Sequence, residues 1–487
     1  MKILLLNAPP LKMFGITGQI YPPLGILYLA SYVREKHNDV EIKAIDGYKE
    51  KSQELINKIV KYSPDILGVS FTTQAASGAY KLINEIKEIN PKIFIVIGGP
   101  HTSSLPEDCL KNSAADIAVI GEGEETFLEI VERIADSSND MNNIAGTAVM
   151  ENGQFKKNPL RPLIEDLDTI PFPARDLIDI TKYPGYMYKK FDSDTDIISA
   201  RGCPFNCTYC SNPVWKLQKP WYRLRSPKNV VDEIESIIRD YGIREIFDET
   251  DEFNGNKKWA KEVCDEIINR GLDIAWKAQM RVDNIDSELV SNLKDSGFWM
   301  GLFGLESAND KTLEGINKKQ TVAQINQALD LFKDSQIKCF GLFMAFNVWE
   351  KDGKLCYENK DDSMRTLSFI KQLIKEKKLH LFGWSMTTPY PGSELYNIAK
   401  RHNIIDKKSI DHWENFDSGS NFIMKLSGVT ASDWSQVINA GKRLQAKLLF
   451  TSGTFNFRAL PLYFKKAYYV IKRNFLNFGM VVLKNKQ

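Results

Sequence analysis

Residues 200–211 read Ala200-Arg201-Gly202-Cys203-Pro204-Phe205-Asn206-Cys207-Thr208-Tyr209-Cys210-Ser211, which places three cysteines within eight positions. Thiolates at this spacing can converge on one soft metal centre. Iron–sulfur clusters are usually held by four cysteines. Because no fourth cysteine is near in the sequence, we predict a cluster with one iron open to a substrate or cofactor. The remaining cysteines are scattered along the chain: Cys109, Cys264, Cys339 and Cys356.

A zinc site and three buried thiols are two other interpretations of the cysteine triplet. A zinc site normally has a fourth ligand, and a Cys-x2-Cys pair usually binds zinc together with a second pair further along the chain. This sequence has no second pair. Three buried thiols would need no such clustering. A cluster with an open iron therefore explains the spacing best.

The triplet resembles the signature of the radical S-adenosylmethionine (SAM) superfamily. The likeness includes Tyr209, directly before the third cysteine, and the lead-in Arg201-Gly202-Cys203-Pro204. It implies a [4Fe–4S] cluster on Cys203, Cys207 and Cys210, with SAM chelated to the open iron through its amino and carboxylate groups. Reductive cleavage of SAM would then give a 5′-deoxyadenosyl radical, with electrons from a flavodoxin or ferredoxin type of donor. In such enzymes the cofactor supplies the chemistry, and the protein binds, orients and excludes water.

The composition is typical of a soluble globular protein, with 43% hydrophobic and 26% charged residues in a chain of 487. A net charge of +2 predicts no nucleic-acid partner. Met1-Lys2 leads straight into a strand-like apolar run rather than a signal peptide, and no apolar run reaches transmembrane length. Seven cysteines, an odd number, favour a reducing compartment, so we expect a cytoplasmic protein.

Residues 1–140 alternate short apolar runs with amphipathic stretches. Continuous β-branched runs between helices indicate a parallel sheet that is buried on both faces. We therefore predict a doubly wound, Rossmann-like (flavodoxin-like) α/β domain, with its ligand beyond the carboxyl ends of the strands. The predicted strands cover 3–7, 40–45, 65–70, 93–97 and 117–120, and the predicted helices cover 22–35, 53–61, 76–89 and a stretch ending near 135.

Small residues and glycines stand where these strands end, so that a broad flat ligand could lie close to the backbone. Ordinary βα turns explain the same residues equally well. No Gly-x-Gly-x-x-Gly follows the first strand, which argues against a dinucleotide. The residues concerned are Ser70, Thr72, Thr73, Gly98, Gly99, His101, Gly121 and Gly123.

Four motifs of this region together resemble the cobalamin-binding domain of B12-dependent radical SAM enzymes. They are Pro22-Pro23-Leu24-Gly25-Ile26, Asp65-Ile66-Leu67-Gly68-Val69-Ser70, Gly98-Gly99-Pro100-His101 and Gly121-Glu122-Gly123-Glu124. The resemblance implies cobalamin at the strand ends just named. The Asp-x-His-x-x-Gly motif, whose histidine binds cobalt in other B12 enzymes, is absent. His101 is then either a cobalt ligand or, as we expect, a loop histidine that bonds to corrin side chains or to the backbone.

Residues 141–190 are predicted to connect two domains. Glu151-Asn152-Gly153-Gln154 indicates a hairpin turn between short strands at 147–150 and 155–157. The proline-containing segment 166–175 is expected to run extended over the surface. We expect no chemistry from this connector.

Residues 191–402 contain six further strand-and-helix units, which suit a partial (β/α)6 barrel. Active sites in barrels lie on the loops that follow the strands. The cysteine triplet follows the first of these strands, where chemistry is expected. The predicted strands cover 196–200, 245–248, 274–280, 299–305, 338–345 and 379–386, and the predicted helices cover 229–241, 257–270, 286–296, 322–335 and 361–376.

Polar side chains mark several strand ends of this predicted barrel. The second strand ends in Asp248-Glu249-Thr250-Asp251-Glu252-Phe253, and an acidic cluster that complements a helix dipole is one explanation. The resemblance implies instead that this position binds the SAM amino group, with Glu249 and Asp251 as candidates. It also implies that Glu306 binds the ribose hydroxyls and that the loop after the last strand lies near the adenine. The remaining SAM candidates are Tyr209, Arg281, Ser307 and Pro389.

The last predicted unit, residues 403–487, is expected to be mostly helical. From Trp434 onward it has no Asp or Glu but many Lys, Arg, Phe and Tyr residues. It is either an ordinary helical cover for the barrel or a basic amphipathic surface that docks on anionic lipid. The stretch 406–426 is expected to border the pocket of a small-molecule or lipid-like substrate.

The two resemblances together imply a B12-dependent radical SAM enzyme that methylates an unactivated carbon. Cyclisation, rearrangement or oxidation without methylation, using the same cofactors, is the alternative. A methylthiotransferase is disfavoured because the N-terminal region has no cysteine trio for a second cluster. The intact triplet and Glu306 argue against a non-catalytic cobalamin-binding regulator.

Overall fold

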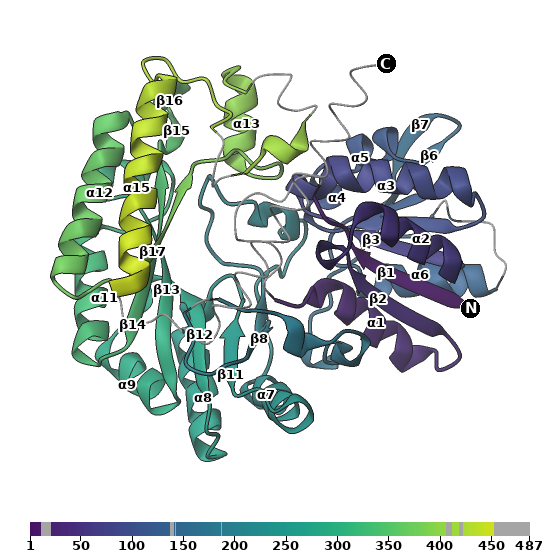
Figure 1. Ribbon diagram of the computed structural model, residues 1–487, viewed down its shortest axis with the longest axis horizontal. Helices are drawn as coiled ribbons and strands as arrows, with labels where there is room; N and C mark the ends of the chain where they lie inside the picture. Colours follow the sequence, from purple (N-terminus) through teal and green to yellow (C-terminus); the bar gives the residue numbers. More distant parts are fainter. Residues whose placement is uncertain are drawn as a thin grey trace.

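The computed structural model describes residues 1–10, 21–136, 141, 143–186, 188–405, 412–417 and 422–451. It has two α/β units side by side, each built on its own sheet (Figure 1). The N-terminal unit, purple to blue in the figure, faces the carboxyl-terminal unit, teal to yellow. No helix in the described ranges is long and apolar enough to cross a membrane.

The N-terminal sheet has seven strands in the order β2-β1-β3-β4-β5-β6-β7, and its first five strands run parallel. This confirms the predicted Rossmann-like unit, because the central order 2-1-3-4-5 is the doubly wound arrangement. The strands are β1 (Lys2–Asn7), β2 (Glu41–Asp46), β3 (Ile66–Ser70), β4 (Phe94–Gly98), β5 (Ile117–Val119), β6 (Thr147–Glu151) and β7 (Gln154–Lys157).

Alternate side chains of each strand enter cores on opposite faces of this sheet. Leu4 and Leu6 of β1 pack with α2, α3 and α5, whereas Ile3 and Leu5 pack with α1 and α6. The period of two explains why the predicted strands read as continuous apolar runs. The helices are α1 (Leu24–Lys36), α2 (Ser52–Tyr62), α3 (Ala76–Ile89), α4 (Pro100–Ser104), α5 (Pro106–Asn112) and α6 (Glu124–Ala135).

The connector differs from its prediction in two respects. The hairpin β6–β7 forms, but β6 pairs antiparallel with β5, so the N-terminal sheet continues to Lys157. The proline-containing segment does not simply run over the surface, because Arg175 is only 4% exposed and donates to Glu233 of the barrel at 2.7 Å. Backbone and carboxylate acceptors inside the protein therefore anchor the connector.

The second sheet has six parallel strands in the order β17-β14-β13-β12-β11-β8, which confirms the predicted half-barrel. Its strands are β8 (Asp194–Ile197), β11 (Glu245–Asp248), β12 (Ala275–Met280), β13 (Phe298–Glu306), β14 (Lys338–Ala345) and β17 (Leu381–Met386). The covering helices are α7 (Pro227–Tyr241), α8 (Lys257–Asn269), α9 (Ser287–Asp295), α11 (Val322–Asp334) and α12 (Lys360–Lys375).

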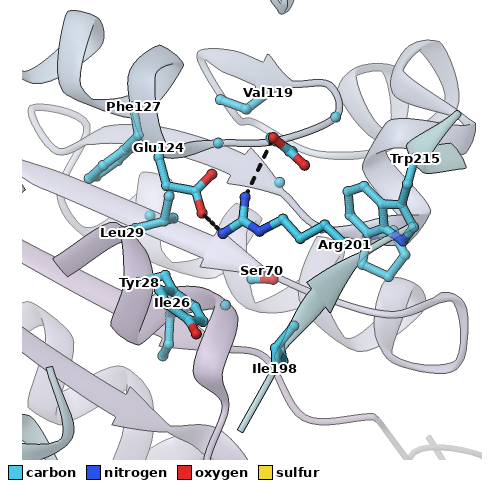
Figure 2. A pocket seen from close by; sticks show the side chains of 18 of the residues that line it. Ile26, Tyr28, Leu29, Ser70, Val119, Glu124, Phe127, Ile198, Arg201 and Trp215 are labelled. Atoms are coloured by element: carbon cyan, nitrogen blue, oxygen red, sulfur yellow. Dashed lines mark hydrogen bonds and ion pairs between the residues drawn. The ribbon is translucent and has the colours of Figure 1, made fainter. Parts of the chain in front are cut away.

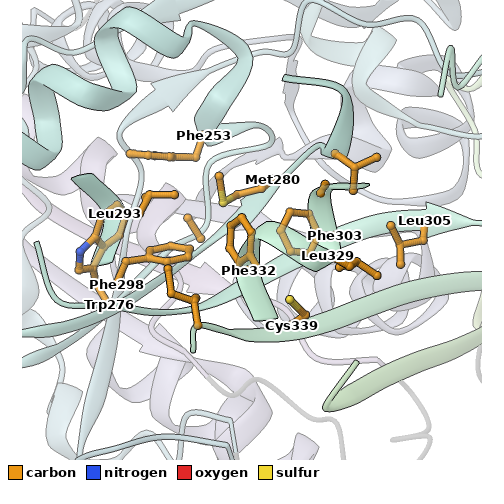
Figure 3. Close-up of a cluster of buried hydrophobic side chains, with 14 of the residues drawn as sticks. Phe253, Trp276, Met280, Leu293, Phe298, Phe303, Leu305, Leu329, Phe332 and Cys339 are labelled. Carbon is orange, nitrogen blue, oxygen red and sulfur yellow. The ribbon is translucent and has the colours of Figure 1, made fainter. Parts of the chain in front are cut away.

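Aromatic side chains fill the space between this sheet and its helices (Figure 3). Trp276 and Phe298 meet edge to face with ring centroids 4.6 Å apart, and Phe303 and Phe332 meet in the same way at 5.0 Å. Such pairs are worth about 1 kcal/mol each beyond the area they bury. The outer face of the half-barrel is therefore a rigid support for the loops above it.

The barrel interior is filled at the amino ends of its strands. Lys277 is fully buried, and its ammonium group lies 2.9 Å from Asp194 and 3.0 Å from Glu245. The hydroxyl of Tyr21 donates to the same Asp194 carboxylate. Tyr188 packs beside them in a small apolar cluster inside the barrel. We call these residues the barrel floor.

Several short elements escaped the sequence analysis. The first barrel strand was expected over 196–200, but β8 ends at Ile197 and Ala200–Arg201 (β9) pairs with Arg223–Leu224 (β10) instead. The other additions are the hairpin of β15 (Val348–Lys351) and β16 (Lys354–Tyr357), and the short helices α4, α5, α10 (Asp310–Gly315) and α13 (Glu394–Arg401).

A helical C-terminal region is confirmed as far as the structure describes it. Helix α15 (Ala431–Thr451) lies along β17, and Gln445 donates to the Phe382 carbonyl at 3.0 Å (Figure 1). It covers the last strand of the half-barrel. Residues 452–487, which carry most of the basic aromatic segment, lie outside the described residues.

Candidate functional site

A cavity of about 360 Å³ lies between the strand ends of the two sheets. One wall comes from the N-terminal unit and the other from the loops after β8 and β11 (Figure 2). The cavity brings together these predicted site residues: Ser70, Gly98, Gly99, Gly121, Gly123, Glu249 and Asp251.

Glycines leave open space along the N-terminal wall, because they have no side chain to fill it. A Cβ atom on Gly25 would have no neighbour within 4 Å, and one on Gly98 would meet only Val119 at 3.9 Å. Gly99 has a φ of +96°, which a residue with a side chain rarely adopts. Ile26, Leu29 and other apolar side chains complete the wall. A broad apolar ring with a polar edge fits this surface.

His101 lies behind this wall rather than in it. The side chain is fully buried, with Nδ1 3.1 Å from the Thr73 hydroxyl and Nε2 3.1 Å from the Tyr80 hydroxyl. Its ring also meets Trp413 at 4.8 Å. Burial lowers the pKa of His101 to about 3. Both ring nitrogens are engaged within the protein, and neither His101, Thr73 nor Thr72 lines the cavity.

The cysteine loop is held by backbone contacts with distant segments. The Thr208 N–H donates to the Ile316 carbonyl at 3.0 Å, and the Thr208 carbonyl accepts from the Leu395 N–H at 2.7 Å. Gly202 has a φ of +77°, and a Cβ there would lie 2.0 Å from the Trp221 carbonyl oxygen. Glycine is therefore required at the entry to the loop.

The three thiols of the loop carry no metal in this structure. Within the described ranges, no three His, Cys, Asp or Glu side chains are gathered closely enough to hold a metal ion. Burial raises the pKa of Cys203 to about 12 and that of Cys210 to about 11. These neutral thiols would ionise only on binding a metal, because thiolates are the ligands.

The surroundings of the thiols nevertheless suit an iron–sulfur cluster. The Asn212 N–H points at the sulfur of Cys210 at 3.5 Å, and the Arg281 guanidinium lies 4.0 Å from the sulfur of Cys207. Donors aimed at sulfur are among the features that tune such clusters. The donor set is soft, half-buried and contained in one loop.

Arg281 holds the cysteine loop from the barrel side. Its guanidinium stacks over the Phe205 ring, with 3.6 Å from the central carbon to the ring centroid. It also pairs with Asp283 at 2.9 Å and donates to the Lys318 carbonyl at 2.6 Å. The structure thus gives Arg281 a supporting role around the loop.

Tyr209, Glu306 and Lys318 form a buried triangle beside the cysteine loop. The Tyr209 hydroxyl donates to Glu306 at 2.8 Å, and the Lys318 ammonium lies 3.0 Å from the same carboxylate oxygen. Two of these residues were predicted from the sequence, but Lys318 was not. It lies 12 positions after Glu306 in no regular element, so a single sequence offers no signal for it.

The acidic run after β11 turns its carboxylates inward. Burial, reinforced by nearby Asp248 and Asp194, raises the pKa of Glu249 to about 7, and burial also raises the pKa of Asp251. The dipole explanation for this run fails, because helix α8 begins later and has no acidic residue in its first turn. These carboxylates lie at the cavity and do not cap the positive end of helix α8, so they are suited to bind a cationic group.

Ser307 and Pro389 are buried and do not line the cavity. The Ser307 hydroxyl is fully buried and donates to Glu358 at 2.6 Å. Pro389 is buried in the loop after β17. Neither side chain reaches the cavity, so their roles toward a ligand stay predictions.

Arg201 joins the two walls of the cavity and was missed in the sequence. Its guanidinium lies 2.5 Å from Glu124 and 3.5 Å from Glu122, and it lies over the Tyr28 ring at 5.5 Å (Figure 2). Arg223 reaches the same Glu122 at 3.0 Å. The turn Gly121–Glu124 is therefore tied to the strand that enters the cysteine loop.

Two family models match this chain. Residues 13–131 match the B12 binding domain, and residues 197–352 match the radical SAM superfamily. The matched ranges contain the glycine-lined wall and the cysteine loop, respectively.

Known proteins are similar over most of the chain. An uncharacterised methyltransferase of Pyrococcus horikoshii is 34% identical over 447 residues, which are 90% of this chain and 91% of that protein. An anaerobic magnesium-protoporphyrin IX monomethyl ester cyclase of Rubrivivax gelatinosus is 29% identical, over 86% of this chain and 72% of that protein.

The fold also has a solved counterpart. It is the radical S-adenosylmethionine methyltransferase TsrM from Kitasatospora setae, whose structure has cobalamin and a [4Fe–4S] cluster bound. The two folds agree with a TM-score of 0.66 at 18% identity, over 83% of this chain and 78% of TsrM.

Proposed function

This chain belongs to the radical SAM enzymes that carry a B12-binding domain, and from that premise we propose that it is a C-methyltransferase acting on an unactivated carbon. The observation that carries the proposal is the shared cavity. It places the glycine-lined wall opposite Glu249 and Asp251, with the cysteine loop at its edge. Two cofactors bound on these walls would face one another, and such proximity is what a group transfer between them requires.

The residues present fit the three cofactors. Cys203, Cys207 and Cys210 would hold the [4Fe–4S] cluster, and the wall around Gly98 and Gly121 would hold cobalamin. When bound, the cluster and SAM supply a 5′-deoxyadenosyl radical, and cobalamin supplies the methyl group.

The chain's own side chains would hold SAM between these walls. Glu249 and Asp251 are proposed to accept from its amino group, because both carboxylates line the cavity. Glu306 is proposed to bind the ribose hydroxyls, with Tyr209 and Lys318 fixing its carboxylate. Buried surroundings exclude water, which protects a reactive radical from side reactions.

A second candidate function is cyclisation without methyl transfer. It is favoured by the 29% identity to a protein named as a cyclase, over 86% of this chain. The same cofactors and the same walls would serve both reactions, so the fate of the methyl group decides between them.

The enzyme acts on a small molecule and needs a reductant, as radical SAM enzymes do. We propose a flavodoxin or ferredoxin type of donor and a reducing, cytoplasmic setting.

We also propose lipid docking by the basic segment after residue 451. Co-sedimentation with anionic vesicles should fall when the chain is ended at Ala459, and unchanged sedimentation would refute the docking.

Anaerobic reconstitution with iron, sulfide and hydroxocobalamin tests the function. The wild-type protein should form 5′-deoxyadenosine from SAM and retain corrin, whereas Cys207→Ala should form none. Cys356→Ala, which removes a half-buried cysteine of β16, is the matched control and should behave as wild type. With methyl-labelled SAM, label in the product supports methylation, and an unlabelled product supports cyclisation.

A further inference from the structure

We propose that solvent-facing lysines beside the cysteine loop, two exposed and one half-buried, form the docking surface of a small acidic electron-carrier protein. The surface consists of Lys216, Lys219 and Lys319 around the loop residues Pro204 and Asn206, and we call it the reductant rim. The inference rests on the proposed function, because only a redox-active cluster needs such a partner.

The rim lies at the outer edge of the cysteine loop. Pro204 and Asn206 are exposed, and they stand between Cys203 and Cys207 in the sequence. The Lys216 ammonium lies 3.0 Å from the Asn206 side-chain oxygen. On the other side, Asn317 donates to the Asn206 carbonyl at 2.7 Å, which places Lys319 two residues further along. Lys219 stands between Lys216 and Trp221 in the sequence, and the Trp221 carbonyl lies against Gly202 at the entry to the loop. Segments from two different loops thus flank the part of the cysteine loop that faces solvent.

The inner side of the loop is not accessible to a protein. Gly202 and Arg201 line the cavity, and Phe205 is covered by the Arg281 guanidinium. A carrier protein therefore approaches a cluster held in this loop from the side of Pro204 and Asn206.

Lys219 and Lys319 carry charges that no carboxylate pairs with in the described residues, whereas half-buried Lys216 interacts electrostatically with Asp251. Among the ion pairs of the described residues, none includes Lys216, Lys219 or Lys319, whereas many other lysines pair with carboxylates. Lys219 and Lys319 are exposed, and the Lys219 ammonium lies 5.3 Å above the Trp221 ring. Glu394, next to the Leu395 that bonds to the loop, is itself paired with Arg401 at 2.8 Å.

Charge complementarity then selects the partner. An unpaired basic surface attracts an acidic protein, speeds its encounter and orients it. The step transfers one electron from the reduced carrier to the cluster and leaves the carrier oxidised by one electron. No bond of this chain is made or broken.

The test compares two reductants on the reconstituted full-length protein. Variant K219E/K319E reverses the two exposed charges and spares Lys216, which bonds to the loop. The readout is the initial rate of 5′-deoxyadenosine formation, driven either by reduced flavodoxin or by the methyl viologen radical cation. We expect the apparent KM for flavodoxin to rise about tenfold, which corresponds to about 1.4 kcal/mol, while the viologen-driven rate stays unchanged.

The control variant is K294E/K333E. Lys294 and Lys333 are exposed at the carboxyl ends of α9 and α11, at the end of the barrel away from the cysteine loop. This variant has the same change in net charge and should keep the wild-type KM for flavodoxin. Added salt should weaken the flavodoxin reaction of wild type and control more than that of K219E/K319E, because screening acts on the rim charges.

The outcomes separate the rim from the function. An unchanged flavodoxin KM in K219E/K319E overturns the rim, and so does an equal loss with both reductants. Absence of 5′-deoxyadenosine from the wild-type protein with viologen overturns the proposed function itself.

Discussion

The guanidinium of Arg201 lies 2.5 Å from the carboxylate of Glu124, and this pair joins the two halves of the molecule across the cavity. Arg201 precedes the cysteine loop, and Glu124 begins helix α6 behind the glycine-lined wall. Burial would raise the pKa of Glu124, but the nearby Arg201 holds it below its usual value. Together with the pairing of Glu122 with Arg223, this pair ties the two cofactor walls to one another across the cavity.

Arg201→Ala should destabilise the protein strongly. Glu124 is only 5% exposed, and a buried carboxylate without its partner costs about 3 kcal/mol or more. Urea denaturation of the protein without cofactors measures the change in the free energy of unfolding. Lysine at this position retains the charge but not the forked geometry of the guanidinium. Arg201→Lys should therefore lose less unfolding free energy than Arg201→Ala. Equal stability of Arg201→Ala and wild type would contradict the role given to the pair.

Gly25→Leu should prevent cobalamin from binding at the glycine-lined wall without unfolding the chain. Gly25 lies in the first turn of α1, lines the cavity and has no neighbour within 4 Å of a Cβ position. A leucine would enter the space meant for the corrin, and overpacking of this kind costs about 1–3 kcal/mol of binding. Corrin retained after gel filtration should fall, with an unchanged melting temperature.

Gly25→Ala is the matched control for that variant. Its single methyl group occupies little of the cavity, so corrin retention should stay near that of wild type. If Gly25→Leu retains corrin as well, the cobalamin lies elsewhere.

Glu306→Gln should weaken SAM binding while the cluster is retained. The substitution removes the charge that Tyr209 and Lys318 hold in place, and a charged hydrogen bond to a diol is worth about 1.5 kcal/mol, or roughly tenfold in KM. Iron content and the KM for SAM in 5′-deoxyadenosine formation are the measurements. Glu314→Gln, an exposed carboxylate on α10, should leave both unchanged.

Glu233→Gln should lower the free energy of unfolding by an amount that depends on pH. Burial would raise the pKa of Glu233, but Arg225 and Arg175 outweigh it, so the folded-state pKa lies below the usual 4.5. A depressed pKa stabilises the folded state above the unfolded-state value, and this stabilisation is lost as the pH falls through the folded-state value. The difference in unfolding free energy between wild type and Glu233→Gln should be about 3 kcal/mol at pH 7 and should shrink below pH 4.5. A constant difference across this range would show that Glu233 does not titrate as proposed.

Regular elements could be predicted because their signals are local. Strands β11 and β14 and helix α3 have the predicted boundaries, because short segments with an apolar centre between stretches of helical periodicity mark buried strands. The break after Ile197 could not be predicted, because apolar Ile198 continues the run. What ends the strand is the pairing of β9 with β10 from a later part of the chain.

The site was predictable where chemistry lies in consecutive residues. The cysteine loop and the glycines after β4 and β5 are short-range patterns, and the latter line the cavity as expected. Lys318 and Arg201 act through partners that only the folded chain brings near. For His101 the sequence favours a loop histidine that bonds to corrin side chains or to the backbone, and the structure adds that Thr73 and Tyr80 engage its ring inside the protein.

The barrel floor has a consequence for turnover. Buried Lys277, with Asp194, Glu245 and Tyr21, blocks the amino end of the half-barrel in the part of the chain that the structure describes. No ligand of the cavity can therefore pass through the half-barrel from that end. The half-barrel is thus a cup and not a channel: its open side is the one that carries the cysteine loop and the cavity.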